Sequence, residues 1–210
     1  MRFIHLTPTF LLLVIVALLI QSCKPTVEEG ETIVNVPQPS EEAIALTVQG
    51  WTAFEQKDYP KALSLFHQAT GKNDLYADAY NGLAWTYARM DSMPKSLQYF
   101  DIALGLNFNL IDAYAGRSFV NLALGEYREA ISAVQRVQDV GPPFYLFRHD
   151  LNVSINDLLL VKAQSYFLLQ DYTAAQELID RLDPENLLDD SSPSYVEDLA
   201  LEIETLWSRI

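Results

Sequence analysis

The sequence predicts an all-α fold, an α-solenoid of about four stacked helix hairpins followed by a C-terminal capping helix. The first observation is a period, because Ala62, Ser96 and Ala130 lie 34 residues apart and each follows a turn and opens an apolar helix. A fixed period of this length is typical of stacked helix pairs. The second observation is an amphipathic segment at residues 192–210. Such a stack needs a terminal element that covers its last open face.

Small and large side chains recur at fixed places within each 34-residue unit, counted from Ala43, Ala77 and Ile111. Small residues let two helix axes approach, and large residues fill the space beside them. The eighth place holds Gly50, Ala84 and Ser118, the twentieth holds Ala62, Ser96 and Ala130, and the twenty-fourth holds Phe66, Phe100 and Val134.

This pattern resembles the tetratricopeptide repeat, a family of 34-residue helix hairpins. The repeats are degenerate, since Ala53 and Asn121 stand where the family usually has an aromatic residue. The resemblance implies a right-handed α-solenoid over residues 41–188. Its units are expected at about 43–76, 77–110, 111–144 and 156–188. Eleven extra residues form an insertion near 141–152, and the fourth unit follows it, with Ala163, Tyr166 and Ala175 in the matching places.

Residues 1–22 have the pattern of a bacterial lipoprotein signal peptide. An apolar run follows Arg2 and ends in Leu19-Ile20-Gln21-Ser22-Cys23, which resembles a lipobox. The resemblance implies cleavage before Cys23 and attachment of acyl chains such as palmitate to this residue. Two alternatives are a plain signal peptide with a chance cysteine and an uncleaved anchor. Cys23 is the only cysteine, so the chain forms no internal disulfide.

Residues 23–40 are rich in proline and glutamate, which is typical of a flexible tether. The formal net charge of the chain is −14. Such an acidic chain disfavours nucleic acid, because counterion release requires Lys and Arg. We therefore expect an exported lipoprotein that is anchored to the membrane at Cys23. In a diderm organism the expected place is the periplasmic face of the outer membrane.

The segment 192–210 is predicted to be one amphipathic capping helix. Ser192 is the expected N-cap and Pro193 suits the first turn. An apolar stripe of leucine, isoleucine and Trp207 is expected to cover the end of the stack.

The resemblance implies that the first helix of each unit lines a concave groove. The ninth place holds Trp51, Trp85 and Phe119, which predicts a ladder of aromatic side chains along this groove. Rigid aromatic residues often anchor a bound chain. The candidate groove residues are Trp51, Phe54, Asn81, Trp85, Arg89, Phe119, Leu122, Gln164 and Phe167.

Two interpretations of the ladder stay open at this point. In the first, it binds an apolar or aromatic segment of a partner protein. In the second, superhelical packing buries the rings, or the tether or the aromatic insertion fills the groove. Replacing Trp85 with alanine separates them: the first predicts weaker partner capture at an unchanged melting temperature, and the second predicts a large loss of stability.

No catalytic or metal-binding pattern is present in the sequence. His5, His67 and His149 are widely separated, and no glycine-rich phosphate loop or HExxH motif occurs. We expect no enzyme activity and no cofactor. Arg89 is the one basic groove residue, so a clamp for a partner's terminal carboxylate is disfavoured. The expected function is a non-catalytic protein–protein interaction scaffold of the cell envelope. The alternatives are a self-associating structural lipoprotein and an envelope protein that binds a small apolar ligand.

Overall fold

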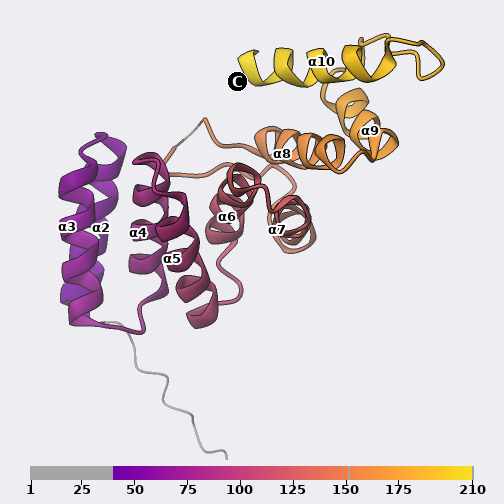
Figure 1. Ribbon diagram of the computed structural model, residues 1–210. Coiled ribbons are helices and arrows are strands. Elements are labelled where there is room, and N and C mark those ends of the chain that lie inside the picture. The colour runs from indigo at the N-terminus through magenta and orange to yellow at the C-terminus, as the bar shows by residue number, and fades with distance from the viewer. Residues whose placement is uncertain (1–39, 151, 210) are drawn as a thin grey trace, which may run out of the picture. The chain divides into compact units, whose positions relative to one another are not determined.

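The computed structural model describes residues 40–150 and 152–209. The predicted signal peptide, Cys23 and nearly all of the predicted tether lie outside these residues. The described part is a series of helix hairpins with one further helix at its C-terminal end (Figure 1). The hairpins are α2 (Glu41–Glu55) with α3 (Tyr59–Lys72), α4 (Ala77–Arg89) with α5 (Met93–Leu106), α6 (Ile111–Leu124) with α7 (Tyr127–Val140), and α8 (Ile155–Leu168) with α9 (Tyr172–Leu182); α10 (Tyr195–Arg209) follows.

Successive hairpins stack on one another, and the first helices α2, α4, α6 and α8 lie next to each other in that order. In the described residues the chain forms helices and one isolated antiparallel bridge between Leu146 and Ser154. The prediction of an all-α solenoid with a C-terminal helix is therefore confirmed. No helix in residues 40–150 and 152–209 is long and apolar enough to cross a bilayer.

The four hairpins share the same turn. In each turn one residue has a positive φ, and the amide of the next residue donates to the carbonyl five residues earlier. This is the hydrogen bond that closes a Schellman motif at a helix C-terminus. The positive-φ residues are Lys57, Asp91, Gly125 and Gln170. Because the last of them belongs to the fourth hairpin, this hairpin keeps the turn of the repeat after the insertion.

The hairpins are held together by phenylalanines that pack against glycines of neighbouring helices. Phe66 is fully buried between α2 and α4. A Cβ atom added at Gly82 would lie 2.2 Å from the Phe66 ring, and one added at Gly50 would lie 2.6 Å from it. Phe100 meets Gly116 of α6 in the same way, at 2.2 Å. Gly50 lets α2 approach the ring within its own hairpin, and Gly82 and Gly116 let α4 and α6 approach the ring of the preceding hairpin.

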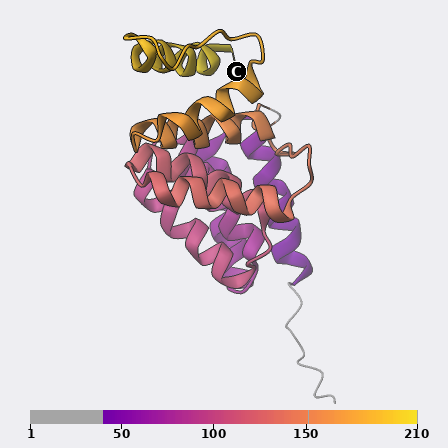
Figure 2. The same cartoon turned by 90° about the vertical axis from the view of Figure 1, so that its right-hand side faces the viewer.

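Helix α10 packs on α8 and α9, where Leu199, Ile203 and Leu206 join Leu160 and Ile179 in a second apolar cluster. Figure 2 shows α10 beyond the last hairpin. The helix begins at Tyr195, three residues after the predicted cap.

The residues before α10 form a turn in which the Tyr195 amide donates to the Ser192 carbonyl. The Asp198 amide donates to the Ser194 carbonyl, so the helical hydrogen bonds start from Ser194 and not from Ser192.

The phenylalanine–glycine contacts predict opposite effects for two alanine substitutions. Gly82→Ala forces the Phe66 ring to move and should lower the free energy of unfolding by about 1–3 kcal/mol. Gly105→Ala is the matched control, because no atom lies within 4 Å of its added Cβ. This second change should raise the free energy of unfolding by about 0.5 kcal/mol through helix propensity. Urea unfolding of both variants measures the difference, and equal effects would contradict the packing described here.

Candidate functional site

The concave face formed by α2, α4, α6 and α8 divides into a covered part and an open part. In the covered part, Trp51, Phe54 and Trp85 are each only 3% exposed, and Asn81 is fully buried. In the remaining part, four predicted groove residues are half-buried, namely Phe119, Leu122, Gln164 and Phe167. Arg89 is exposed at the boundary between the two parts.

The insertion between α7 and α8 covers the first part. Its backbone is ordered by two paired hydrogen bonds: the Phe147 amide donates to the Val153 carbonyl at 2.8 Å, and the Ile155 amide donates to the Tyr145 carbonyl at 2.9 Å. This arrangement turns the side chain of Phe147 towards α2 and α4. The side chain is completely buried there.

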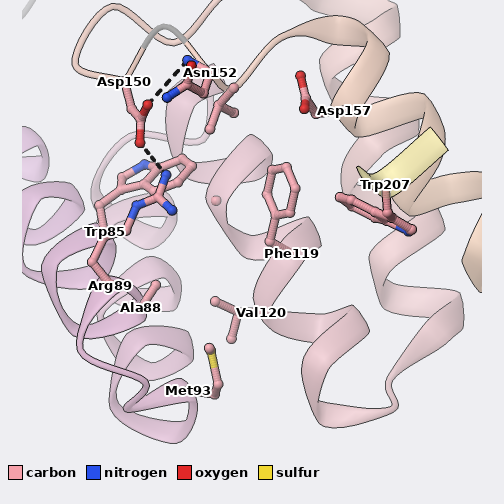
Figure 3. Close-up of a pocket in the computed structure, with 12 residues that line it drawn as sticks. Trp85, Ala88, Arg89, Met93, Phe119, Val120, Asp150, Asn152, Asp157 and Trp207 are labelled. Atoms are coloured by element: carbon pink, nitrogen blue, oxygen red, sulfur yellow. Dashed lines mark hydrogen bonds and ion pairs between the residues drawn. The ribbon is translucent and has the colours of Figure 1, made fainter. Parts of the chain in front are cut away.

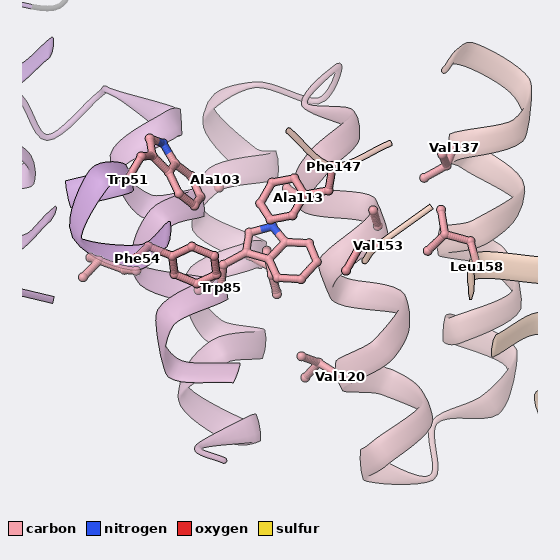
Figure 4. Packing of buried hydrophobic residues seen from close by; sticks show 14 of the residues in the cluster. Trp51, Phe54, Trp85, Ala103, Ala113, Val120, Val137, Phe147, Val153 and Leu158 are labelled. Carbon is pink, nitrogen blue, oxygen red and sulfur yellow. The ribbon is translucent and has the colours of Figure 1, made fainter. Parts of the chain in front are cut away.

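Phe147 occupies a slot between the two tryptophans (Figure 4). Its ring stacks on Trp85 with a centroid distance of 4.3 Å and an interplanar angle of 15°. The same ring meets Trp51 edge-on at 5.9 Å. Two residues further along the insertion, the imidazole of His149 stacks on Trp51 at 4.0 Å. Stacked and edge-on pairs of this kind add to the stabilisation from apolar burial.

Both buried indole groups keep a hydrogen-bond acceptor. The Nε1–H of Trp51 donates to Asp78 Oδ2 at 3.2 Å, and that of Trp85 donates to the Asp112 carbonyl at 3.1 Å. The hydroxyl of Tyr145 donates to the Asp112 carboxylate at 2.9 Å. The insertion therefore covers the rings while both indole N–H groups keep an acceptor. An indole donor without an acceptor would be costly in a buried site.

Burial shapes the ionisation of the pair formed by Asp112 and Tyr145. Burial raises the pKa of the Asp112 carboxyl, and the hydrogen bond from Tyr145 opposes this rise. Burial, together with the charge of Asp112, raises the pKa of the Tyr145 hydroxyl far above its usual value. Tyr145 therefore stays a neutral donor at physiological pH.

Charged pairs surround the insertion at its solvent-exposed edge. Arg89 forms an ion pair with Asp150, and His149 Nδ1 lies 2.8 Å from Glu55 Oε1. Arg148 lies 4.0 Å from Asp78. Since Arg89 is engaged by the chain's own carboxylate, it does not present a free cation to the groove.

Of the two interpretations left open by the sequence, the second describes the structure at Trp51 and Trp85. These rings are covered because the insertion supplies an aromatic ring that contacts both of them. Both tryptophans lie on first helices of their hairpins, Trp51 on α2 and Trp85 on α4. Whether they bind a partner stays a prediction.

The open part of the groove contains a cavity of about 380 Å³ between α4, α6, the insertion and α10 (Figure 3). Trp85 and Ala88 border it on α4, and Phe119 and Val120 border it on α6. Trp207 of α10 borders the same cavity. The indole Nε1–H of Trp207 donates to Gln164 Oε1 at 2.7 Å, which connects the capping helix to a predicted groove residue.

Sequence reasoning assigned Trp207 to the apolar stripe of the cap and did not place it in the groove. A tryptophan at the C-terminal end of a capping helix was the available signal. Leu122 and Phe167 do not border the cavity. Leu122 packs against the buried cluster that contains Phe66 and Phe100, and Phe167 packs against the second apolar cluster under α10. Within the described residues, His, Cys, Asp and Glu side chains form no group that could hold a metal ion.

The comparisons with known proteins agree with this geometry. Residues 47–116 match the tetratricopeptide repeat family. No curated protein sequence matches the chain significantly. The family match and the solved structures described next support a tetratricopeptide repeat protein, as the residue pattern predicted.

Three solved structures illustrate the shared tetratricopeptide fold. PilF of Pseudomonas aeruginosa is 18% identical, with 80% of this chain and 67% of that chain covered and a TM-score of 0.57. YrrB, a tetratricopeptide protein with an unusual peptide-binding site, is 19% identical over 78% of this chain and 74% of that chain, with a TM-score of 0.57. The first repeat domain of Spaghetti (RPAP3), bound to the HSP90 peptide SRMEEVD, is 21% identical over 60% of this chain and 98% of that chain, with a TM-score of 0.52.

The burial of Trp85 predicts that its removal destabilises the protein. Trp85→Ala leaves a cavity beneath Phe147 and should lower the free energy of unfolding by about 3–5 kcal/mol. Phe144→Ala removes an aromatic ring from the same insertion, but this ring is 89% exposed and its loss should change stability by less than about 0.5 kcal/mol. Thermal and urea unfolding of both variants measure the effect. An unchanged Trp85→Ala variant would show that the ring is not buried in solution.

Proposed function

We propose that this chain is a non-catalytic scaffold that captures an apolar or aromatic segment of a partner protein in the open part of its groove. The observation that carries the proposal is the cavity of about 380 Å³ between α4, α6 and α10. Its volume lies at the lower end of the range for ligand sites. It suits one or two bulky side chains of a bound segment better than a long peptide.

The walls of the cavity suit an apolar anchor. Phe119 and Val120 of α6 and Trp207 of α10 converge on one space (Figure 3). Aromatic residues in such a pocket are the ones that most often contribute the largest share of binding energy. Arg89 and Asp150, which form an ion pair, also line the cavity, and such polar groups would set the orientation of a bound segment.

The solved structures with the same fold lend support. One of them, the Spaghetti domain, is bound to an HSP90 peptide, and another, YrrB, has a peptide-binding site. A shared fold does not specify a partner. We therefore derive the chemistry of the partner from the residues of this cavity and not from those of the related folds.

Phe119 provides the direct test of this site. Phe119→Ala should reduce the amount of partner captured from envelope extracts at least tenfold, because it removes the central ring of the cavity. Phe108→Ala is the matched control, since this ring is 65% exposed and does not border the cavity. A quantitative pull-down with both variants at equal folded concentration makes the comparison. Equal capture by the two variants would contradict the proposed site.

Two other functions use the same cavity and are separated from the first by simple measurements. A small apolar ligand would enter the cavity and change the fluorescence of Trp85 or Trp207. A second copy of the chain would fill it on association, which sedimentation would detect as a dimer. Both measurements use the purified protein without any other protein present. They therefore distinguish these two functions from capture of a different protein.

We also propose that the scaffold is a lipoprotein of the cell envelope, attached through Cys23. The support is the lipobox-like pattern Leu19-Ile20-Gln21-Ser22-Cys23 after an apolar run. Stable attachment needs more than one acyl chain. Acylation of both the thiol and the new amino group of Cys23 would provide it, and would hold the groove near a membrane surface.

Cys23→Ser tests the anchor. The change removes the acceptor thiol, so the protein should no longer incorporate labelled palmitate and should shift from the membrane to the soluble fraction. Ser22→Ala is the control, because it keeps a small residue at the preceding lipobox position and should leave labelling unchanged. Full palmitate labelling of the serine variant would rule out Cys23 as the attachment site.

A further inference from the structure

The structure assigns to the insertion the role of an internal ligand. We infer that the covered part of the groove, around Trp51 and Trp85, is a second binding site for a protein segment that carries an aromatic residue followed three positions later by a carboxylate. Phe147 and Asp150 of the insertion have this spacing and occupy the site in the free protein. The inference rests on the proposed function, since it extends partner binding to the other half of the groove.

The insertion is not required to connect the hairpins. The connections from α3 to α4 and from α5 to α6 each take four residues, 73–76 and 107–110. The connection from α7 to α8 runs from residue 141 to residue 154. The extra length carries Phe147 back to α2 and α4, where it pairs with side chains more than sixty residues away in sequence.

The insertion contacts the groove as a bound peptide would. One side chain, Phe147, enters a slot made by two groove residues, Trp51 and Trp85. A carboxylate, Asp150, pairs with the basic groove residue Arg89. A buried aromatic anchor with charged contacts at the rim is the usual anatomy of a recognition site.

The insertion is packed tightly at some residues and loosely at others. Phe144 and Leu146 are exposed, whereas Tyr145 and Val153 are buried beside Phe147. The ion pairs at its edge involve partly exposed side chains, and such pairs contribute little in water. Tyr145, Phe147 and Val153 belong to the same buried cluster as Phe66 and Phe100, so release of the insertion must open one side of this cluster while the hairpins stay stacked.

Tethering explains why the site is filled in the free protein. A segment joined to its own site by a short connection has an effective concentration in the millimolar range. A partner segment with the same anchors must compete with this concentration, so it binds weakly to the intact protein. Once Phe147 is withdrawn, the same segment should bind without competition.

The charge of the groove sets the chemistry of the partner. Arg89 favours a carboxylate three positions after the aromatic residue. Glu55 and Asp78 face His149 and Arg148, which favours basic or imidazole side chains between the two anchors. The expected partner segment therefore has an aromatic residue, two basic or neutral residues and an acidic residue in this order.

A labelled peptide with the sequence of residues 143–150 tests the inference in trans. Fluorescence anisotropy compares its binding to the full chain and to the Phe147→Ala variant of the full chain. The variant vacates the slot and should bind the peptide at least tenfold more tightly than the unchanged protein. Phe144→Ala is the matched control, because it removes an exposed ring of the same insertion and should bind like the unchanged protein.

The anchors are tested on the peptide itself. A peptide with alanine in place of Phe147, or with asparagine in place of Asp150, should bind the Phe147→Ala protein at least tenfold more weakly. The inference would be overturned if all three peptides bound equally well. It would also be overturned if the Phe147→Ala protein bound the peptide no more tightly than the unchanged protein. The Phe119→Ala pull-down concerns the open cavity alone, so failure of either proposal is visible separately.

Hydrogen exchange of the unchanged protein gives a second measurement that does not depend on the folding of a variant. The amides of Phe147 and Val153 donate to the carbonyls of Val153 and Asp150 within the insertion. If the insertion leaves its site while the solenoid stays folded, these amides should exchange at least tenfold faster than the amides of α4. If the insertion amides and the α4 amides exchange at the same slow rate, the insertion is a permanent part of the core and the inference is overturned.

Discussion

The close approach of α4 and α6 to the phenylalanine of the preceding unit is the contact on which the rest of the structure depends. Phe66 against Gly82, and Phe100 against Gly116, leave no space for a Cβ atom. This spacing sets the first helices side by side, so that side chains at equivalent places face a common concavity. The contact also reaches the groove, because a Cβ at Gly116 would lie 2.7 Å from the Trp85 ring.

A concave row of large aromatic side chains needs a cover, and this chain supplies one. Phe147 stacks on Trp85, while Asp78 and Asp112 accept hydrogen bonds from the two indoles. The cover extends over α2 and α4 and reaches the start of α6 at Asp112, but Phe119, further along α6, borders an open cavity. The groove thus has one half that is filled from within and one half that is available, and both proposed binding sites follow from that division.

The sequence was sufficient to place much of the candidate site. The period of 34 residues put Trp51, Trp85 and Phe119 on one face, because residues at the same place of a repeat share an environment. It was not sufficient to say what covers that face. The ion pair of Arg89 with Asp150 joins residues 61 apart, and the contact of Glu55 with His149 joins residues 94 apart. Such contacts leave no periodic signal, and neither does the approach of Trp207 to Gln164.

The sequence by itself determined the hairpins, the places where small residues let helices approach, and the fourth repeat after the insertion. These features depend on turn geometry and on periodicity, which are local and repeat along the chain. It also contains all the support for an anchor at Cys23, which lies outside the described residues. The tertiary structure alone decided the path of the insertion, the burial of Trp51 and Trp85, and the start of α10 at Tyr195. Those features are set by which distant surfaces pack together, and the order of residues along the chain does not specify this packing directly.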